Sequence, residues 1–516
     1  MFHPGNRRKH SPSACKGSLS SRHLLFIIPI MMACAGALIF FVGPRNAVRA
    51  AGASRGLFVS QAQKAETPAD AAFRISQASS AGVDRDAAFP DVAYNPEDNE
   101  YLVVWEGDGL SGAEFRRVKE IFGQRLNAAT GAEIGPDFLI SRMSDSGHTH
   151  VANQPQIVYN SAAHEYLVVW HGAGATGDPD EVFEIYGQRL SRSGVEIGKD
   201  FRISHTTDAG KIQENIVRQS SNADVAWDSA SNQYLVVWEG MGQPEDAVKV
   251  EIYGQLLSAK GDALGKGFRI SNTTDQGQGF NASGPEVAFN SANSRYLVVW
   301  AGGFKEMNQS EIWAQGLTAQ GAQVGAGNGD FRISQITTSI GSNRDAGAAH
   351  VVYNNTVNEY MVVFQATGLA GAGVEGLREI FGQRINAATL QETGPEDFRI
   401  SNTAGPKNEA DNPRVSYNSA DKEYLVIWRG VRDVGPYEIF AQRLSPLGAE
   451  IDADFQVSNI AAIGKDRKVN LASVACNSAS GEYLTVWQGD QLPGPTSRRI
   501  NEIFGLRIKS SARRRP

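Results

Sequence analysis

A short pattern of apolar and polar residues recurs along this chain. At its centre a tyrosine is followed by aliphatic residues and then by an aromatic one. The copies are EYLVVWEG (100–107), EYLVVWHG (165–172), QYLVVWEG (233–240), RYLVVWAG (295–302), EYMVVFQA (359–366), EYLVIWRG (423–430) and EYLTVWQG (482–489). The aromatic position recurs every 59 to 68 residues. Such a period indicates tandem copies of one structural unit.

Each unit holds three further apolar segments in a fixed order around this one. In the first unit they are DVAYN (91–95), EIFGQRL (120–126) and DFLIS (137–141). The segments are short, rich in β-branched and aromatic residues, and bounded by Gly, Asn, Ser and Pro, which is typical of strands joined by turns. No convincing helical period occurs beyond residue 50. The pattern predicts an all-β protein with four strands in each unit.

The second strand is apolar on both of its faces. Tyr101, Val103 and Trp105 point to one side, and the aliphatic residues between them point to the other. A strand of this kind is covered on both sides. Tandem four-stranded sheets meet that condition when they stack face to face around an axis, as the blades of a β-propeller do. The small residue in the third strand, Gly123 in the first unit, leaves room for a neighbouring ring.

The order of the segments predicts how the ring closes. A segment of the fourth kind, FRIS at 73–76, precedes the first unit, and the last unit ends at 508 without one. We therefore expect a seven-bladed β-propeller of four-stranded blades, in which the N-terminal strand 73–76 completes the last blade. Closure of this kind removes the open sheet edges of a linear array.

The seven copies of YLVVW, EIxGQRL and FRIS over residues 71–508 resemble the β-propeller repeats of secreted and cell-surface bacterial proteins, whose functions are mostly unassigned. The sequence lacks the WD40, kelch and integrin FG-GAP signatures. The resemblance implies an exported propeller and does not identify its ligand.

The N-terminus predicts export. Residues 24–43 are continuously apolar and follow a basic segment, which is typical of an export signal. Residues 1–50 are either a cleaved signal peptide or an uncleaved membrane anchor, because the apolar run is long enough to span a bilayer. We expect a flexible spacer at 51–70 and a disordered basic tail at 509–516. The predicted location is secreted, periplasmic or at the cell surface.

Charge and cysteine content narrow the choice of partners. The first 50 residues carry seven basic residues and no acidic one, so the remainder of a chain with net charge −7 sums to −14. An acidic body gains nothing from counterion release, and we expect no nucleic-acid partner. Membrane contact is expected only through 24–43, if that segment is uncleaved. Outside the export segment the chain has one cysteine, Cys476, so the fold must be stable without an internal disulfide.

The loops and one strand position suggest where a ligand would bind. The connections after the second and fourth strands are long and unlike one another, and in an up-and-down blade they share one face. Polar residues that differ between blades precede the apolar part of each first strand and would face the axial opening. These candidate ligand-binding residues are Asp91, Gln156, Asp224, Glu286, His350 and Arg414, with Ser473 in the last unit. A solvated channel mouth would contain similar residues, so both interpretations stay open.

Other polar residues carry weaker signals. A glutamate opens every third strand (120, 184, 251, 311, 379, 438 and 502), which indicates a structural role in each blade, such as pairing with the arginine of GQRL or accepting loop N–H groups. Asp145, Asp208 and Asp275 precede an x-Gly, which suits a turn or a calcium loop. His148 and His150 could touch one metal ion, but no third ligand is near in sequence. We expect no cofactor and no metal site.

These observations predict an exported, monomeric, non-catalytic binding module that contacts a protein or carbohydrate at the cell surface through its long-loop face. One alternative is a carbohydrate-active enzyme, either a hydrolase or a lyase, with carboxylates at the axial mouth. Asp91, Asp224 and Glu286 are its candidate groups. A second alternative is a structural envelope protein. A propeller fold alone does not choose among them.

Overall fold

The computed structural model describes most of the repeat region and part of each long connection. The described residues are 71–77, 86–108, 118–143, 151–173, 182–206, 219–241, 250–272, 280–304, 309–325, 329–335, 345–367, 377–402, 409–432, 435–460, 468–490 and 500–513. The predicted export segment 1–50 and spacer 51–70 lie outside them. Within the described ranges, no helix has the length and apolar character needed to cross a membrane.

The strands follow the four segments that the sequence predicts. The first strands are β2 (Ala87–Asn95), β6 (Val151–Asn160), β10 (Ser220–Asp228), β14 (Phe280–Asn290), β19 (Ala346–Asn354), β23 (Glu409–Asn418) and β27 (Val469–Asn477). The second strands are β3 (Glu100–Gly107), β7 (Glu165–Ala173), β11 (Gln233–Gly240), β15 (Arg295–Phe304), β20 (Glu359–Thr367), β24 (Glu423–Val431) and β28 (Glu482–Gly489). The third strands are β4 (Glu120–Asn127), β8 (Phe183–Ser191), β12 (Glu251–Ser258), β16 (Gln309–Thr318), β21 (Arg378–Asn386), β25 (Glu438–Leu444) and β29 (Glu502–Lys509). The fourth strands are β5 (Glu133–Leu139), β9 (Glu196–Arg202), β13 (Phe268–Arg269), β17 (Gln323–Val324) with β18 (Phe331–Arg332), β22 (Glu392–Arg399), β26 (Glu450–Gln456) and β1 (Phe73–Arg74).

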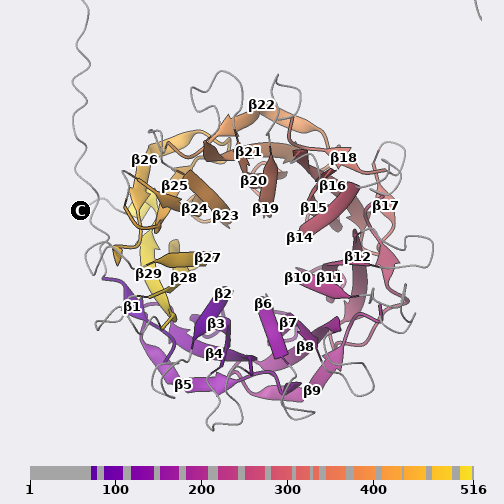
Figure 1. Cartoon of the computed structure of the whole chain (residues 1–516), viewed down its shortest axis with the longest axis vertical. Helices are drawn as coiled ribbons and strands as arrows, with labels where there is room; N and C mark the ends of the chain where they lie inside the picture. Colours follow the sequence, from indigo (N-terminus) through magenta and orange to yellow (C-terminus); the bar gives the residue numbers. More distant parts are fainter. Residues whose placement is uncertain are drawn as a thin grey trace, which may run out of the picture. The chain divides into compact units, whose positions relative to one another are not determined.

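The strands form seven antiparallel sheets arranged as blades around an axis, with the first strand of each blade innermost (Figure 1). We number the blades 1 to 7 from β2 to β29. The fourth blade has its outer strand in two pieces, β17 and β18, which both pair with β16. The all-β, seven-bladed propeller predicted from the repeats is confirmed.

The second strands form the core between blades. All eight residues of β3 are buried. Tyr101, Val103 and Trp105 pack in one cluster with residues of blade 7, whereas Leu102 and Val104 pack in another with residues of blade 2. The two apolar faces of one strand therefore bind two neighbouring blades, which is the reason that this segment is apolar throughout.

The small residue in the third strand makes room for the fourth strand of the same blade. Gly123 pairs with Phe138, and a Cβ at Gly123 would lie 3.1 Å from the Phe138 ring and 2.9 Å from Cδ1 of Ile140. The same phenylalanine reaches the next blade, where a Cβ at Gly194 would lie 2.8 Å from its ring. The fourth strand thus links its own blade to the following one.

A hydrogen bond between a serine and a buried glutamate joins each fourth strand to its third strand. We call this contact the hook and its serine the hook serine. Ser141 donates to the carboxylate of Glu120, and its Oγ accepts the backbone N–H of Ile121 at 2.8 Å. Equivalent serine–glutamate hydrogen bonds occur in all seven blades. The predicted structural role of the glutamates fits this pattern, but the suggested pairing with the arginine of GQRL is wrong. That arginine binds the glutamate that opens the second strand, as Arg125 binds Glu100 at 2.7 Å.

The ring closes between the two ends of the propeller, as predicted. Phe73 pairs with Gly505 and Arg74 with Phe504, so β1 completes the sheet of β29, β28 and β27. Figure 1 shows β1 beside β29, at opposite ends of the colour scale. Ser76 donates a hydrogen bond to Glu502, as Ser141 does to Glu120 inside blade 1. The closing contact thus repeats a contact found within every other blade.

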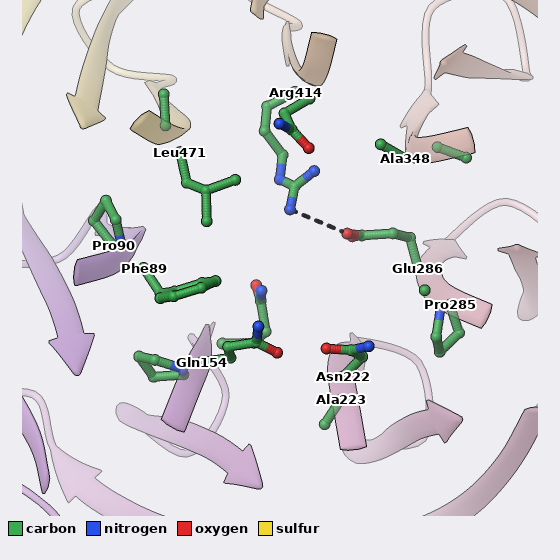
Figure 2. A pocket seen from close by; sticks show the side chains of 16 residues that line it. Phe89, Pro90, Gln154, Asn222, Ala223, Pro285, Glu286, Ala348, Arg414 and Leu471 are labelled. Carbon is green, nitrogen blue, oxygen red and sulfur yellow. Dashed lines mark ion pairs between the residues drawn. The ribbon is translucent and has the colours of Figure 1, made fainter. Parts of the chain in front are cut away.

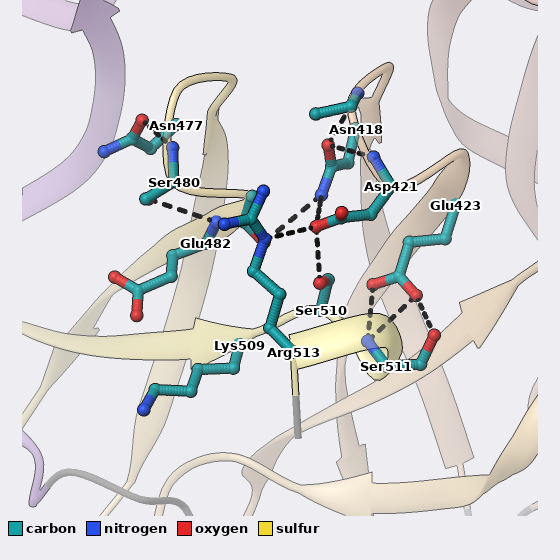
Figure 3. A network of polar contacts seen from close by, with 12 residues as sticks. Asn418, Asp421, Glu423, Asn477, Ser480, Glu482, Lys509, Ser510, Ser511 and Arg513 are labelled. Atoms are coloured by element: carbon teal, nitrogen blue, oxygen red, sulfur yellow. Dashed lines mark hydrogen bonds and ion pairs between the residues drawn. The ribbon is translucent and has the colours of Figure 1, made fainter. Parts of the chain in front are cut away.

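The chain end makes a second contact beyond β29. Ser511–Arg513 form a short 3-10 helix against the turn between the first and second strands of blade 6 (Figure 3). Ser510 donates to Asp421 at 2.6 Å, Arg513 donates to the same oxygen at 2.9 Å, and Ser511 donates its backbone N–H to Glu423. The predicted tail 509–516 is therefore built into the fold as far as Arg513, and 514–516 lie outside the described residues.

Candidate functional site at the axial mouth

The first strand of each blade carries a bulge that faces the axis. In β2 the register shifts between Ala88 and Asp91, so that Phe89 and Pro90 stand opposite the single residue Trp105. Phe89 has a φ of 51°, which an L-residue rarely adopts. Bulges of this kind redirect side chains and are frequent beside active sites.

The bulge recurs at the equivalent place in five further blades. The residues with positive φ there are Gln154 (51°), Asn222 (50°), Gly284 (59°), Ala348 (46°) and Asn412 (49°). Blade 7 has its register shift between Val469 and Ala472. At the non-glycine residues of this set the conformation costs about 1–3 kcal/mol each, and it persists only where the surrounding structure enforces it. The bulges thus give the axial opening a fixed wall.

A cavity of about 320 Å³ lies inside this wall. The bulge residues line it, together with Gln156, Glu286 and Arg414. In Figure 2 the Phe89 ring points into the opening, and Arg414 extends toward Glu286 from across it. The lining combines amide groups, one aromatic ring, one carboxylate and one guanidinium. These are groups that orient a polar ligand in a small site.

The structure separates the six predicted site residues into two sets. Gln156, Glu286 and Arg414, from blades 2, 4 and 6, line the cavity. Asp91, Asp224 and His350, from blades 1, 3 and 5, do not line it and instead bind the next blade. Their acceptor atoms take the backbone N–H groups of Ile157 at 2.9 Å, Val287 at 2.7 Å and Val415 at 3.4 Å, respectively.

Glu286 stands at the centre of the charged groups. Its carboxylate lies 3.4 Å from Nη2 of Arg414 and 3.8 Å from Nε2 of His350, and it shares a side-chain hydrogen bond with Asp224. Only 13% of the Glu286 side chain is exposed. Three blades beside its own therefore contribute to the environment of this one carboxylate.

Burial changes the protonation of this group of residues. Burial raises the pKa of Asp224 well above its usual value, and the charge of Glu286 raises it further. Burial also raises the pKa of Glu286, but the Arg414 guanidinium opposes that rise. We infer that Asp224 and Glu286 together carry one proton and one negative charge, in preference to two negative charges, and that the proton is on Asp224. A neutral acid and a carboxylate then lie side by side.

His350 is held neutral beside this pair. Burial lowers its pKa well below the usual value, and the nearby Arg414 charge lowers it further. Because Nδ1 accepts the N–H of Val415, the proton of the neutral ring is on Nε2, which faces Glu286. The ring therefore presents a donor to the carboxylate.

Asp91 provides a second carboxyl group near the axis. Burial raises its pKa, whereas hydrogen bonds from Ser473 and from the backbone of Ile157 lower it. Ser473, which the sequence also places at the axial position, donates to Asp91 at 2.7 Å across the boundary of blades 7 and 1. Both oxygens of Asp91 thus have protein partners, and its contacts are those of a structural bridge.

Sequence reasoning missed the bulge residues, which form much of the cavity wall. A two-residue alternation places Phe89 and Gln154 on a sheet face and not in the opening. The sequence did contain a signal for these bulges: Pro90, Pro155 and Pro285 directly precede axial residues. A proline inside a strand is confined to an edge or a bulge.

The candidate metal and calcium residues are not tested by the structure. Asp145, His148, His150, Asp208 and Asp275 lie outside the described residues. Among the residues that are described, no group of three or more His, Cys, Asp or Glu side chains is placed to hold a metal ion.

No family model matches the sequence, and no curated protein matches it significantly. Comparison with solved structures finds propeller folds. The polysaccharide lyase Uly1 is 8% identical, with a TM-score of 0.48, over 81% of this chain and 89% of the lyase. An α-L-arabinofuranosidase from Fusarium graminearum is 13% identical, with a TM-score of 0.42, over 69% and 92%. The β-propeller domain of the Trilobed protease from Pyrococcus furiosus is 8% identical, with a TM-score of 0.44, over 82% and 94%.

These findings correct one prediction. The expected non-catalytic binding module is contradicted, because carbohydrate-active enzymes are prominent among the structural neighbours and agree better with the enzyme alternative. At these identities and TM-scores the likeness is one of fold alone. An activity of this chain must therefore be argued from its own side chains.

Proposed function

We propose that this protein is a carbohydrate-active enzyme that cleaves a glycan at the axial mouth, with Glu286 as its acid–base group. The observation that carries the proposal is the position of Glu286, which lines the cavity while Asp224, His350 and Arg414 bind it. The lyase and the arabinofuranosidase named above fall in the same broad class, but the proposal rests on the mouth itself.

The chemistry of the mouth suits a glycosidic bond. Cleavage of such a bond requires proton transfer to the leaving oxygen, and a carboxyl group with a raised pKa can supply that proton near neutral pH. Glu286 is the carboxylate that reaches the cavity, and Asp224 behind it holds a proton that the shared hydrogen bond can pass forward. Asp224 therefore supplies a proton to Glu286, whereas His350 positions the Glu286 carboxylate.

The remaining lining residues suit a sugar. The amides of Gln154, Gln156 and Asn222 each offer a donor and an acceptor to hydroxyl groups. The Phe89 ring offers a flat apolar surface for the C–H face of a sugar ring. The mouth can accordingly orient a sugar unit against Glu286.

The test uses the full chain with a panel of neutral and acidic polysaccharides. Release of reducing ends reports any cleavage, and ultraviolet absorbance of unsaturated ends distinguishes a lyase from a hydrolase. We expect Glu286→Gln, which keeps the size of the side chain, to lower kcat by roughly 10²–10⁴-fold on the polysaccharide that is cleaved. Glu133→Gln changes an exposed carboxylate in the outer strand β5 and should keep wild-type activity.

Phe89→Ala separates binding from chemistry, because it should raise KM more than it lowers kcat. A wild-type kcat in Glu286→Gln, or the absence of product from every polysaccharide of a broad panel, would reject the proposal.

We also propose that the protein acts outside the cytoplasm, as a monomer, where glycans are accessible. The support is the basic segment followed by the apolar run 24–43 in the sequence. The repeat resemblance to exported bacterial propellers agrees with this location.

A further inference from the structure

The outer junctions between blades share one contact that involves an aspartate. This aspartate precedes the phenylalanine of the fourth strand and accepts the backbone N–H of the residue that follows the hook serine of the preceding blade. The pairs are Gln77–Asp137 (2.8 Å), Arg142–Asp200 (2.7 Å), Asn272–Asp330 (2.6 Å), Gln335–Asp397 (2.8 Å) and Asn402–Asp454 (3.1 Å). The same place in the chain therefore holds a carboxylate at five junctions.

At four of these junctions a second acidic residue contacts the side chain of the same residue in the preceding blade. Arg142, for example, binds Glu196 at 3.0 Å in addition to its contact with Asp200. The other pairs of this second kind are Gln77–Glu133, Gln335–Glu392 and Asn402–Glu450. These junctions are thus built to surround carboxylate groups with donors.

The junction of blades 2 and 3 lacks both acidic residues. Alignment of the repeats places Ala263 where blade 2 has Glu196, and Gly267 where blade 2 has Asp200. The closing blade also lacks the aspartate, with Ala72 before Phe73, but there the fourth strand comes from the N-terminal end of the propeller. Among the blades whose third and fourth strands follow each other directly in the chain, blade 3 is therefore the one that lacks the aspartate.

A cavity of about 400 Å³ opens at this junction. Ser204, His205 and Thr206 line it from blade 2, and Trp238, Tyr253, Gln255 and Lys266 line it from blade 3. Among the described residues, the atom nearest to a Cβ built at Gly267 would be Oε1 of Gln255, at 3.5 Å. None of these residues fills the space that an aspartate side chain fills at the other junctions.

The charges around this cavity favour an anion. Lys266 lies in its lining, and Arg202 places Nη2 at 2.6 Å from Nδ1 of His205. The two acidic side chains that other junctions carry at these positions are replaced here by Ala263 and Gly267. The wall also contains the paired rings of Trp238 and Tyr253, the hydroxyl of Thr206 and the amide of Gln255.

We infer that the cavity between blades 2 and 3 binds a sugar acid, whose carboxylate takes the place that an aspartate carboxylate occupies at five other junctions. Lys266 and the Arg202–His205 pair attract the carboxylate, and the polar wall receives the sugar hydroxyls. This site lies in the outer junction and not at the axial mouth. We assign it binding alone, and it does not depend on the proposed role of Glu286.

The test measures binding of D-glucuronate to the full chain by calorimetry, with D-glucose as the uncharged counterpart. The decisive variant is Gly267→Asp, which restores the carboxylate that the other junctions carry. It has room in the structure, and Gly267 does not have a positive φ. We expect wild type to bind glucuronate and not glucose, and Gly267→Asp to bind glucuronate at least about tenfold more weakly, because a charge-assisted contact is lost.

One control isolates the site. Gly329→Asp adds the same charge beside Asp330 at the next junction, where no described residue places an atom within 4 Å of the new Cβ, and it should bind glucuronate as wild type does. Equal binding of glucose, no binding of glucuronate by wild type, or wild-type affinity in Gly267→Asp would each overturn the inference.

Discussion

Removal of the closing strand tests the architecture most directly. We consider a variant that lacks residues 71–77 and retains the rest of the propeller. The deletion removes Phe73, which is partly buried, and Ile75, which is fully buried in the cluster between blades 7 and 1. It also removes Ser76, the hydrogen-bond partner of the buried Glu502.

The expected cost follows from these three side chains. Burial of the two apolar residues contributes about 1.5–3 kcal/mol each, or roughly 3–6 kcal/mol together. Loss of the Ser76 hydroxyl removes a hydrogen bond from the buried carboxylate of Glu502, which costs about 1–3 kcal/mol more. Because a typical domain has about 5–15 kcal/mol of stability, we expect a large fall in the free energy of unfolding.

Denaturant unfolding followed by tryptophan fluorescence measures this loss, because Trp105 and Trp487 lie in or beside the affected junction. A synthetic peptide of residues 71–77, added at increasing concentration, should restore part of the lost stability by mass action. The same peptide with Ile75→Ala should restore less. A deletion variant as stable as wild type, or one insensitive to the peptide, would refute closure by this strand.

Two further predictions concern pH and processing. Burial raises the pKa of Asp397 to about 7, so the folded protein holds this proton more tightly than the unfolded chain does. The free energy of unfolding should therefore fall as pH rises from about 4 to about 7, by at most about 4 kcal/mol from this residue, and Asp397→Asn should flatten that part of a measured stability–pH profile. N-terminal sequencing of the native protein should begin near Ala51 if the export segment is cleaved, whereas full-length protein in the membrane would indicate an anchor, and full-length protein in the cytoplasm would contradict export.

Much of the fold could be predicted because the repeat presents each constraint seven times. The apolar faces of Tyr101–Trp105 required cover on both sides, and the unmatched FRIS segment required a partner blade. The serine of the hook was present in every copy as well. The sequence did not reveal its role, because a serine at the end of a strand is typical of a turn. Its glutamate partner lies about 20 residues earlier in the chain, and only the structure shows that the two meet.

The axial site was predicted only in part, for a geometric reason. The sequence indicated Glu286 and Arg414 as axial residues, and both line the cavity. It placed Asp91 and Asp224 in the same ring, although these side chains bind the next blade instead. Register does not cause the difference, because the bulge stands directly before the axial residue in all of these blades. The short side chains of Asp91 and Asp224 accept a backbone N–H of the next blade, whereas the longer side chains of Glu286 and Arg414 reach the opening.

The hook between the third and fourth strands affects how the number of blades in such a protein can change during evolution. The genetic unit runs from one fourth strand to the following third strand, so any number of units leaves an unpaired fourth strand at one end and an incomplete blade at the other. These two ends recognise each other through the same serine and glutamate that join neighbours inside the chain. A chain that has gained or lost one whole unit would therefore still have two ends that can pair. Only the angle between neighbouring blades would have to change to close the ring.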